Sequence, residues 1–397
     1  MNIRHLIFVS LEEWDDMWRR NQFVCSKLIE RNAGLTILFV QPALDISHAV
    51  RTGKVAALFA RRQAPTAGNS RIVCTRALKL FPNSWSWGRK INEWMQRLHV
   101  RRMSRRLGFE QPTLWLNAHG AVHMAAKMSE AAVIYDVTDD WTAFGGSCAC
   151  GLALTKAQDR ELCEKADAVI VCSERLRELK APLARRLHLI PNGVDAAHYA
   201  SASDERAAIP DDARGWKYPV LGYTGTVHSE RVDVSLVEAL ARRMPDCTFA
   251  FIGPNMLTPP DYQRLAALPN VILAGPRPYS ELPAYMRAFQ ICMTPHVVTP
   301  FTESLNPIKL WDYLATGKPV ISTPVAGFRD YPSLVHLAAD ADAFAASIGQ
   351  ALTEDADLPR QRRSEAAKHS WDSRVEAIEA VLEEHGAAQP LASLAQS

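Results

Sequence analysis

The sequence lacks both a long hydrophobic run and a strong excess of charge of either sign. No stretch reaches the roughly 18 to 20 uninterrupted apolar residues that span a bilayer, and 45 basic residues stand against 43 acidic ones among 397, for a formal net charge of +2. Domains dedicated to nucleic-acid binding usually carry a basic excess over the whole fold, so we expect no nucleic-acid partner. We expect a cytoplasmic protein.

Two common site motifs are also missing. The loop after the first predicted strand, residues 10–22, contains no G-x-G-x-x-G sequence, which argues against a nicotinamide-dependent dehydrogenase. The eight cysteines are scattered, and the pair Cys148 and Cys150 has no second Cys/His pair at zinc-binding spacing. We therefore expect free thiols, no metal and no cofactor.

The chain does contain a regular alternation of two patterns. A length of 397 residues favours two domains, since it exceeds what one hydrophobic core normally supports. Short apolar, β-branched runs alternate with helical patterns, which predicts an α/β fold with parallel sheets. The runs form two series that separate at the polar stretch 200–214. We expect an N-terminal domain at 1–200, a C-terminal domain at 215–370, and a C-terminal helix and tail at 371–397.

Ligands of such sheets bind beyond the carboxyl ends of the strands, and the segment NPIKLWDYLATGKPVI follows a predicted strand there. Asn306 is a suitable N-cap, Pro307 a suitable first residue and Gly317 a suitable exit for a helix. The positive helix N-terminus and Lys309 would attract an anion such as a diphosphate, and Asp312 could accept hydrogen bonds from ribose. Alternatively, Lys309 and Asp312 form a solvated pair on an ordinary helix.

Four segments together resemble a known enzyme family. PIKLWDYLATGKPVIST resembles the signature helix of retaining GT-B glycosyltransferases of family 4, and the segments 135–141, 166–173 and 190–195 resemble other parts of it. The likeness covers nearly the whole chain and extends to the bacterial branch acting in teichuronic acid and exopolysaccharide assembly. It implies a GT-B fold of two Rossmann-like domains with parallel sheets facing across a cleft. The N-terminal domain would bind the acceptor, and the C-terminal domain the nucleotide sugar.

Carried over to this sequence, the resemblance assigns the donor site to the C-terminal domain. The helix start at Asn306 and Lys309 would bind the diphosphate, and Asp312 would bind the ribose. Glu303 is nearest to the family's first glutamate, but the spacing to Asp312 is one residue longer than usual and places Ser304 at the strict position.

The loops after three other predicted strands supply further donor-binding candidates. Gly225, Thr226 and Arg231 follow VLGYTG, where family members reach the diphosphate. The alternative is that the glycine only makes a tight turn and Arg231 is an exposed surface residue. By analogy with the fold, Gly253 and Arg277 would approach the base or the phosphate.

The N-terminal domain supplies the candidates for acceptor chemistry. His119 follows the run TLWLNA, where family members present a histidine to the reacting sugar; a structural loop histidine is the alternative. Asp136 and Asp139 follow AVIY and could orient acceptor hydroxyls, serve as a base, or merely cap a helix. Arg19 and Arg20 could meet an acidic or lipid diphosphate acceptor.

The expected activity is transfer of a sugar from a UDP- or GDP-sugar to a glycan or lipid-linked acceptor, with retention favoured by the motif. Retention needs stabilisation of the leaving diphosphate, whereas inversion needs a side-chain base. A sugar-nucleotide epimerase of the same fold and a catalytically silent binding paralogue remain as alternatives.

The segment Trp85–Leu107 combines tryptophans at helical spacing with many basic residues. This pattern predicts a helix that contacts an anionic membrane surface at the inner face of the plasma membrane. The alternative is a core helix with a solvated basic end.

Overall fold

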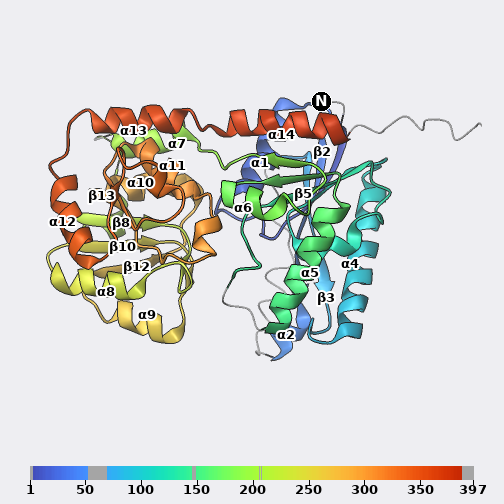
Figure 1. Cartoon of the computed structure of the whole chain (residues 1–397), viewed down its shortest axis with the longest axis horizontal. Coiled ribbons are helices and arrows are strands. Elements are labelled where there is room, and N and C mark those ends of the chain that lie inside the picture. Colours follow the sequence, from blue (N-terminus) through green and yellow to red (C-terminus); the bar gives the residue numbers. More distant parts are fainter. Residues whose placement is uncertain (1–2, 52–68, 145–148, 205, 207, 387–397) are drawn as a thin grey trace, which may run out of the picture. The chain divides into compact units, whose positions relative to one another are not determined.

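The computed structural model describes residues 3–51, 69–144, 149–204, 206 and 208–386, which form two compact units (Figure 1). The first unit comprises Met1–Thr138, Ser147–Ile190 and Val375–Ser397, and the second comprises Asp139–Gly146 and Pro191–Arg374. The chain thus divides just before Pro191, ahead of the expected boundary at 200–215. The polar stretch chosen as the boundary contains Ala202 and Ala213, which are buried with Tyr199 in a core of the second unit.

The first unit is built on a seven-stranded parallel sheet. Its strands, in spatial order, are β3 (Ile72–Lys79), β2 (Thr36–Asp45), β1 (His5–Val9), β4 (Thr113–Leu116), β5 (Ala132–Val137), β6 (Ala168–Val171) and β7 (Leu187–Leu189). Its helices are α1 (Arg20–Arg31), α2 (Ile46–Arg51), α4 (Ser86–Arg106), the 3₁₀ helix η1 (His119–Met124), α5 (Ala149–Lys165), α6 (Glu174–Lys180) and most of α14 (Trp371–Gly386). The central strands are apolar on both faces, as parallel strands between two helical layers must be.

The second unit is built on a six-stranded parallel sheet with a separate two-stranded ribbon. The sheet order is β12 (Val271–Gly275), β10 (Thr248–Ile252), β8 (Val220–Thr224), β13 (Ile291–Thr294), β14 (Val320–Ser322) and β15 (His336–Leu337); the ribbon pairs β9 (Val227–His228) with β11 (Asn255–Met256). The helices are α7 (Ala196–Ala200), α8 (Val234–Arg243), α9 (Pro259–Ala266), α10 (Leu282–Arg287), α11 (Ile308–Thr316), α12 (Ala341–Ala351) and α13 (Leu358–Ala367). Short 3₁₀ turns join them at Ser201–Ser203, Asp211–Ala213, Tyr279–Glu281, Thr302–Ser304 and Phe328–Asp330.

Two hydrophobic cores cover the two faces of the second sheet. One contains Leu240 of α8 and Phe344 of α12, and the other contains Tyr285 of α10 and Leu314 of α11. Two parallel sheets with alternating helices confirm the predicted α/β class. None of the helices in the described part of the chain combines the length and apolar composition needed to cross a membrane.

A buried arginine joins three elements of the second unit. The Arg362 guanidinium is completely buried and donates hydrogen bonds to the Leu334 carbonyl (2.8 Å), to Glu354 Oε2 (2.7 Å) and to the carbonyl of Gly317 (3.4 Å). Gly317 ends α11 with φ 78°, the left-handed conformation expected for this residue. Arg362 therefore secures the C-terminal end of α11.

We predict that Arg362→Met lowers the free energy of unfolding of the second unit by about 3 kcal/mol, because it leaves Glu354 without its buried partner. Arg360→Met is the matched control on the same helix, since its ion pair with Asp357 is largely exposed and should contribute under about 1 kcal/mol. Guanidinium unfolding of both variants measures the difference. Equal midpoints would contradict a stabilising role for Arg362.

Candidate donor site

The second sheet has a topological switch point beside β8. From β8 the chain proceeds outward through β10 to β12, and then returns to the other side of β8 at β13. In open parallel sheets, ligands bind at the carboxyl ends of the strands where the order reverses in this way. The loops after β8 and β10 and helix α11 after β13 carry Gly225, Gly253 and Lys309, so three predicted residues gather at this point.

Two glycines bring the backbone close at the switch point. Gly225 has φ 124° and Gly253 has φ 146°, in a region that L side chains rarely adopt. A Cβ on Gly253 would lie 2.2 Å from the Gly225 carbonyl oxygen, and a Cβ on Gly225 would lie 2.5 Å from Lys309 Nζ. The glycines therefore do more than form a turn: they leave space for the lysine.

The Lys309 ammonium occupies a partly buried position in this space. Its Nζ lies 5.1 Å from the centroid of the Tyr223 ring, a cation–π distance. Burial and the neighbouring Arg231 charge lower the pKa of Lys309 to about 8. One turn further along α11, the Tyr313 hydroxyl accepts a hydrogen bond from the Thr224 amide (2.9 Å) and holds the helix against the end of β8.

Asp312 lies on the same helix beside Tyr199. Burial raises the pKa of Asp312 to about 8, although Lys309 and a hydrogen bond from the Tyr199 hydroxyl act in the opposite direction. Neither Lys309 nor Asp312 is exposed. The alternative of a solvated surface pair is therefore wrong.

The start of α11 differs from the prediction. The helix begins at Ile308, and Pro307, which makes no side-chain cap, is the N-cap residue. The predicted N-cap, Asn306, instead accepts a hydrogen bond on Oδ1 from the Asn192 amide (2.8 Å), while the Asn306 carbonyl accepts one from Asn192 Nδ2 (2.7 Å). The prediction for Asn306 was wrong because an asparagine side chain is equally suited to cap a helix and to form a hydrogen bond with a distant part of the chain.

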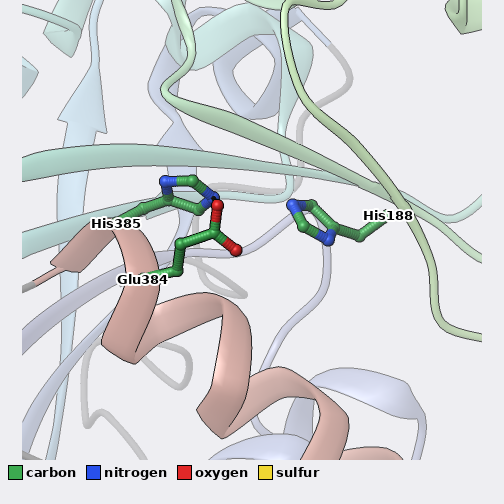
Figure 2. A group of neighbouring side chains, drawn as sticks. All are labelled: His188, Glu384 and His385. Carbon is green, nitrogen blue, oxygen red and sulfur yellow. Dashed lines mark ion pairs between the residues drawn. The ribbon is translucent and has the colours of Figure 1, made fainter.

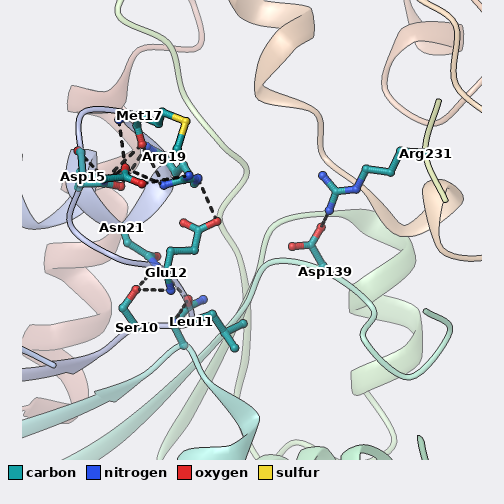
Figure 3. A network of polar contacts seen from close by, with 11 residues as sticks. Ser10, Leu11, Glu12, Asp15, Met17, Arg19, Asn21, Asp139 and Arg231 are labelled. Carbon is teal, nitrogen blue, oxygen red and sulfur yellow. Dashed lines mark hydrogen bonds and ion pairs between the residues drawn. The ribbon is translucent and has the colours of Figure 1, made fainter. Parts of the chain in front are cut away.

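Arg231 is held in place by two contacts and is not an exposed surface residue. Its Nη2 lies 3.6 Å from Asp139 Oδ1, as Figure 3 shows, and its guanidinium lies 5.2 Å from the centroid of the Phe301 ring. The Asp139 carboxylate also raises the pKa of Lys309, after burial and Arg231 have lowered it. Asp139 thus supplies a negative charge to the two cations.

The structure distinguishes Glu303 from Ser304. The Ser304 hydroxyl is fully buried, donates to the Phe301 carbonyl (2.7 Å) and accepts from the Asp140 amide (3.3 Å). Glu303 pairs through Oε2 with Arg329, while its Oε1 is buried and has no partner in the described part of the chain. Glu303 therefore keeps an unused acceptor, and Ser304 does not.

The other two donor candidates, Arg277 and Thr226, also form hydrogen bonds within the second unit. Arg277 donates to Asp212 (2.8 Å) and to the Tyr285 hydroxyl (2.6 Å), so it is secured at the end of β12. The Thr226 carbonyl accepts a hydrogen bond from the Tyr223 hydroxyl (3.1 Å), beside the ring that contacts Lys309.

Asp136 of the first unit is unsuited to act as a base. It lies within β5 and not in the loop after it, so it caps no helix. Its two carboxylate oxygens each accept a hydrogen bond from Arg20 at 3.1 Å, and both side chains are almost completely buried. Because Arg20 is buried in this ion pair, it is not placed to bind the acceptor substrate. Arg19 pairs with Asp15 (3.0 Å) and Glu12 (3.4 Å) in the loop after β1 (Figure 3).

His119 begins η1 after β4, at the point where the order of the first sheet reverses between β1 and β4. Burial lowers its pKa, and the nearby Asp159 carboxylate opposes this while Lys180 adds to it. Asp159 itself accepts hydrogen bonds from Lys180 (2.6 Å) and from the Tyr135 hydroxyl (2.8 Å). The lowered pKa of His119 favours its neutral imidazole form.

One cluster in the described ranges has metal-ligand character. His188 of β7 and Glu384 and His385 of α14 place a ligand atom each within 4.8 Å of one another (Figure 2). However, the Arg186 guanidinium lies 2.9 Å from His385 Nδ1 as a donor, which puts the ring proton on Nε2, the atom facing Glu384 at 3.2 Å. In that tautomer neither ring nitrogen of His385 offers a free lone pair to a metal ion. Cys148 lies outside the described residues.

Three tyrosines at the site were not predicted from the sequence: Tyr313 of α11, and Tyr199 and Tyr223, which lie beside Asp312 and Lys309 of that helix. All three are buried, and burial raises the pKa of each hydroxyl. Tyr223 lies in GYTG and Tyr313 in WDY, directly beside predicted residues, but neither pattern distinguishes a site tyrosine from a core tyrosine.

Comparisons with known proteins agree with this geometry. Residues 218–354, which contain most of the site, match the family described as Glycosyl transferases group 1. The putative teichuronic acid biosynthesis glycosyltransferase TuaH of Bacillus subtilis is 29% identical over 224 residues. That match spans about half of each protein, 54% of this chain and 56% of TuaH.

Solved structures resemble nearly the whole chain. Sucrose-phosphate synthase of Thermosynechococcus elongatus has a TM-score of 0.70 at 16% identity and covers 97% of this chain and 100% of its own. HepE of Anabaena, solved in complex with UDP-glucose, has a TM-score of 0.66 at 14% identity over 96% of this chain and 99% of its own. The predicted GT-B fold class is thereby confirmed, and residues 218–354 are similar to the group 1 glycosyl transferases.

Proposed function

We propose that this protein is a glycosyltransferase that moves a sugar from a nucleoside diphosphate sugar to a glycan or lipid-linked acceptor in the synthesis of a cell-surface polysaccharide. The observation that carries the proposal is the Lys309 ammonium, held beside Gly225 at the switch point of the second sheet. The family match over this segment, the likeness to TuaH and the UDP-glucose complex of HepE support it.

In the proposed complex, the donor diphosphate binds Lys309, Arg231 and the backbone amides at the start of α11 and in the loop of Gly225 and Thr226. Two cations and oriented amides stabilise the charge that develops on a leaving diphosphate, so we propose that no divalent metal is required. Asp312 would bind the ribose, and Glu303 would offer its unused Oε1 to a hydroxyl of the donor sugar.

We further propose transfer with retention of the anomeric configuration. Inversion requires a side-chain base at the acceptor hydroxyl, and the ion pair with Arg20 occupies Asp136. His119, whose lowered pKa favours the neutral form, stays available to orient the acceptor or to accept its proton. Nuclear magnetic resonance of the first-formed product gives the anomeric configuration directly; an inverted product would assign the base role to His119.

An epimerase and a silent binding paralogue would share the donor contacts. Incubation with the donor alone distinguishes an epimerase from a transferase, since an epimerase converts the donor without any acceptor. Turnover of a nucleotide sugar in the presence of a membrane or glycan extract excludes the second.

We predict that one nucleotide and its sugars, from a panel of UDP, GDP, ADP and dTDP derivatives, raise the melting temperature of the protein, because a ligand of the folded state stabilises it in proportion to affinity. In Lys309→Met this shift should be lost, whereas Lys217→Met, which changes an exposed lysine of the same unit, should keep it. No shift from any nucleotide would contradict donor binding, and an equal shift in Lys309→Met would contradict the role of Lys309.

We predict that UDP binding weakens as the pH rises from 7 to 9. Lys309, with a pKa of about 8, loses its positive charge in this range, and Asp312, also with a pKa of about 8, gains a negative one. Both changes disfavour a diphosphate. Loss of the Lys309 charge alone should raise the dissociation constant by up to roughly tenfold per pH unit above 8, and ionisation of Asp312 should add to this rise. Calorimetric titrations of the wild-type protein at several pH values measure this constant. Binding that stays constant or tightens between pH 7 and 9 would contradict the assignment.

We predict that Asp139→Asn tightens UDP binding by roughly two- to fivefold, the equivalent of one partly exposed ion pair. The amide keeps the shape of the side chain but no longer competes with the phosphates for Arg231 and Lys309. Weaker binding in this variant would show that Asp139 positions the cations and does not compete for them.

A further inference from the structure

Helix α4 of the first unit directs its large apolar side chains outward. Trp87, Ile91, Trp94 and Leu98 follow one another at intervals of four, three and four residues, which places them on one stripe of the helix. Their exposed fractions are 53%, 38%, 57% and 52%. In an ordinary surface helix such a stripe faces the core.

The opposite face of α4 is buried but consists of small and polar residues: Gly88, Asn92, Val100 and Ser104. The Asn92 carboxamide accepts hydrogen bonds from the Leu80 and Phe81 amides (3.0 and 3.2 Å) and donates one to the Phe81 carbonyl (2.8 Å). A Cβ on Gly88 would lie 2.7 Å from Phe81 Cβ, so the helix is held tightly by this face. The outward stripe is therefore not needed to hold α4 on the sheet.

Side chains next to the start of α4 extend the apolar surface. Trp85 is 50% exposed, and its ring stacks on Trp87 with centroids 5.5 Å apart. Leu78 of β3 and Leu80 after it are both exposed, and β3 packs beside α4. We call the surface made by Trp85, Trp87, Ile91, Trp94 and Leu98 the tryptophan stripe.

The same stripe continues into exposed arginines. Arg101, Arg102 and Arg105 follow Leu98 on the same side of the helix and are exposed. Over its whole length, α4 carries seven lysines and arginines and a single acidic residue, Glu93, which pairs with Arg89. The surface is thus apolar at one end and strongly cationic at the other, although the chain as a whole is nearly neutral.

We propose that α4 docks on an anionic lipid bilayer through the tryptophan stripe, with Arg101, Arg102 and Arg105 contacting headgroup phosphates. Tryptophan prefers the membrane–water interface, and each basic residue near an anionic surface adds to the attraction. Tryptophan and arginine are also enriched at protein–protein interfaces, so a protein partner or a second copy of the chain is an outcome that the test must separate. The proposal is independent of the transferase activity.

Vesicle co-sedimentation tests the proposal at low salt with the full chain. Wild-type protein should bind phosphatidylglycerol-containing vesicles at least tenfold better than pure phosphatidylcholine vesicles, and 0.5 M salt should weaken that binding. The double variant Trp87→Ser/Trp94→Ser should lose binding at least tenfold. The triple variant Arg101→Gln/Arg102→Gln/Arg105→Gln should lose the preference for anionic lipid.

Matched controls separate this surface from general charge and from misfolding. Arg175→Gln/Arg177→Gln removes two exposed arginines from α6 of the same unit and should bind vesicles as the wild type does. Unchanged melting temperatures show that the variants fold. Wild-type protein that ignores anionic vesicles, variants that bind as well as wild type, or a dimer in solution that only Trp87→Ser/Trp94→Ser dissociates would each overturn the proposal.

Discussion

The close approach of two glycine loops at the switch point of the second sheet is the constraint on which the candidate site depends. Because Gly225 and Gly253 carry no side chains, the ends of β8 and β10 lie against each other and leave room for the Lys309 side chain. Helix α11 is then fixed at both ends, by the Asn192–Asn306 contacts at its start and by Arg362 at Gly317. A buried cation is costly unless its surroundings compensate for lost water, and the Tyr223 ring and the Asp139 carboxylate do so in part.

Much of the fold could be predicted from the sequence, and the failures have physical reasons. The short apolar, β-branched runs are strands, because buried parallel strands are apolar on both faces. Strand β3 was missed, since it lies at the sheet edge and mixes apolar with basic residues. Strands β7 and β15 have only three and two residues, too few for a periodic signal. The domain boundary was displaced because the polar stretch 200–214 nevertheless buries Ala202 and Ala213 in a core of the second unit.

The candidate site could be predicted in outline but not in its pairings. The residues after β8, β10 and β13 were identifiable from turn glycines and the α11 motif. Asp136 and Arg20 are far apart in the sequence but form an ion pair. No local sequence pattern indicates which carboxylate Arg20 will contact. The association of Asp139 with Arg231 was hidden for the same reason. Tertiary contacts thus decided which of several chemically suitable side chains remain available.

The ends of the second unit's main segment meet in space. The Val194 amide donates to the His369 carbonyl (2.9 Å), and the Trp371 amide donates back to the Val194 carbonyl (3.3 Å). Trp371 also packs against Gly193, where a Cβ would lie 2.9 Å from its backbone. The two ends of segment 191–374 are therefore adjacent. This arrangement is typical of a domain that is inserted into the chain of another domain. An exchange of this segment between related enzymes would, however, also have to include residues 139–146, which carry Asp139 and belong to the same unit.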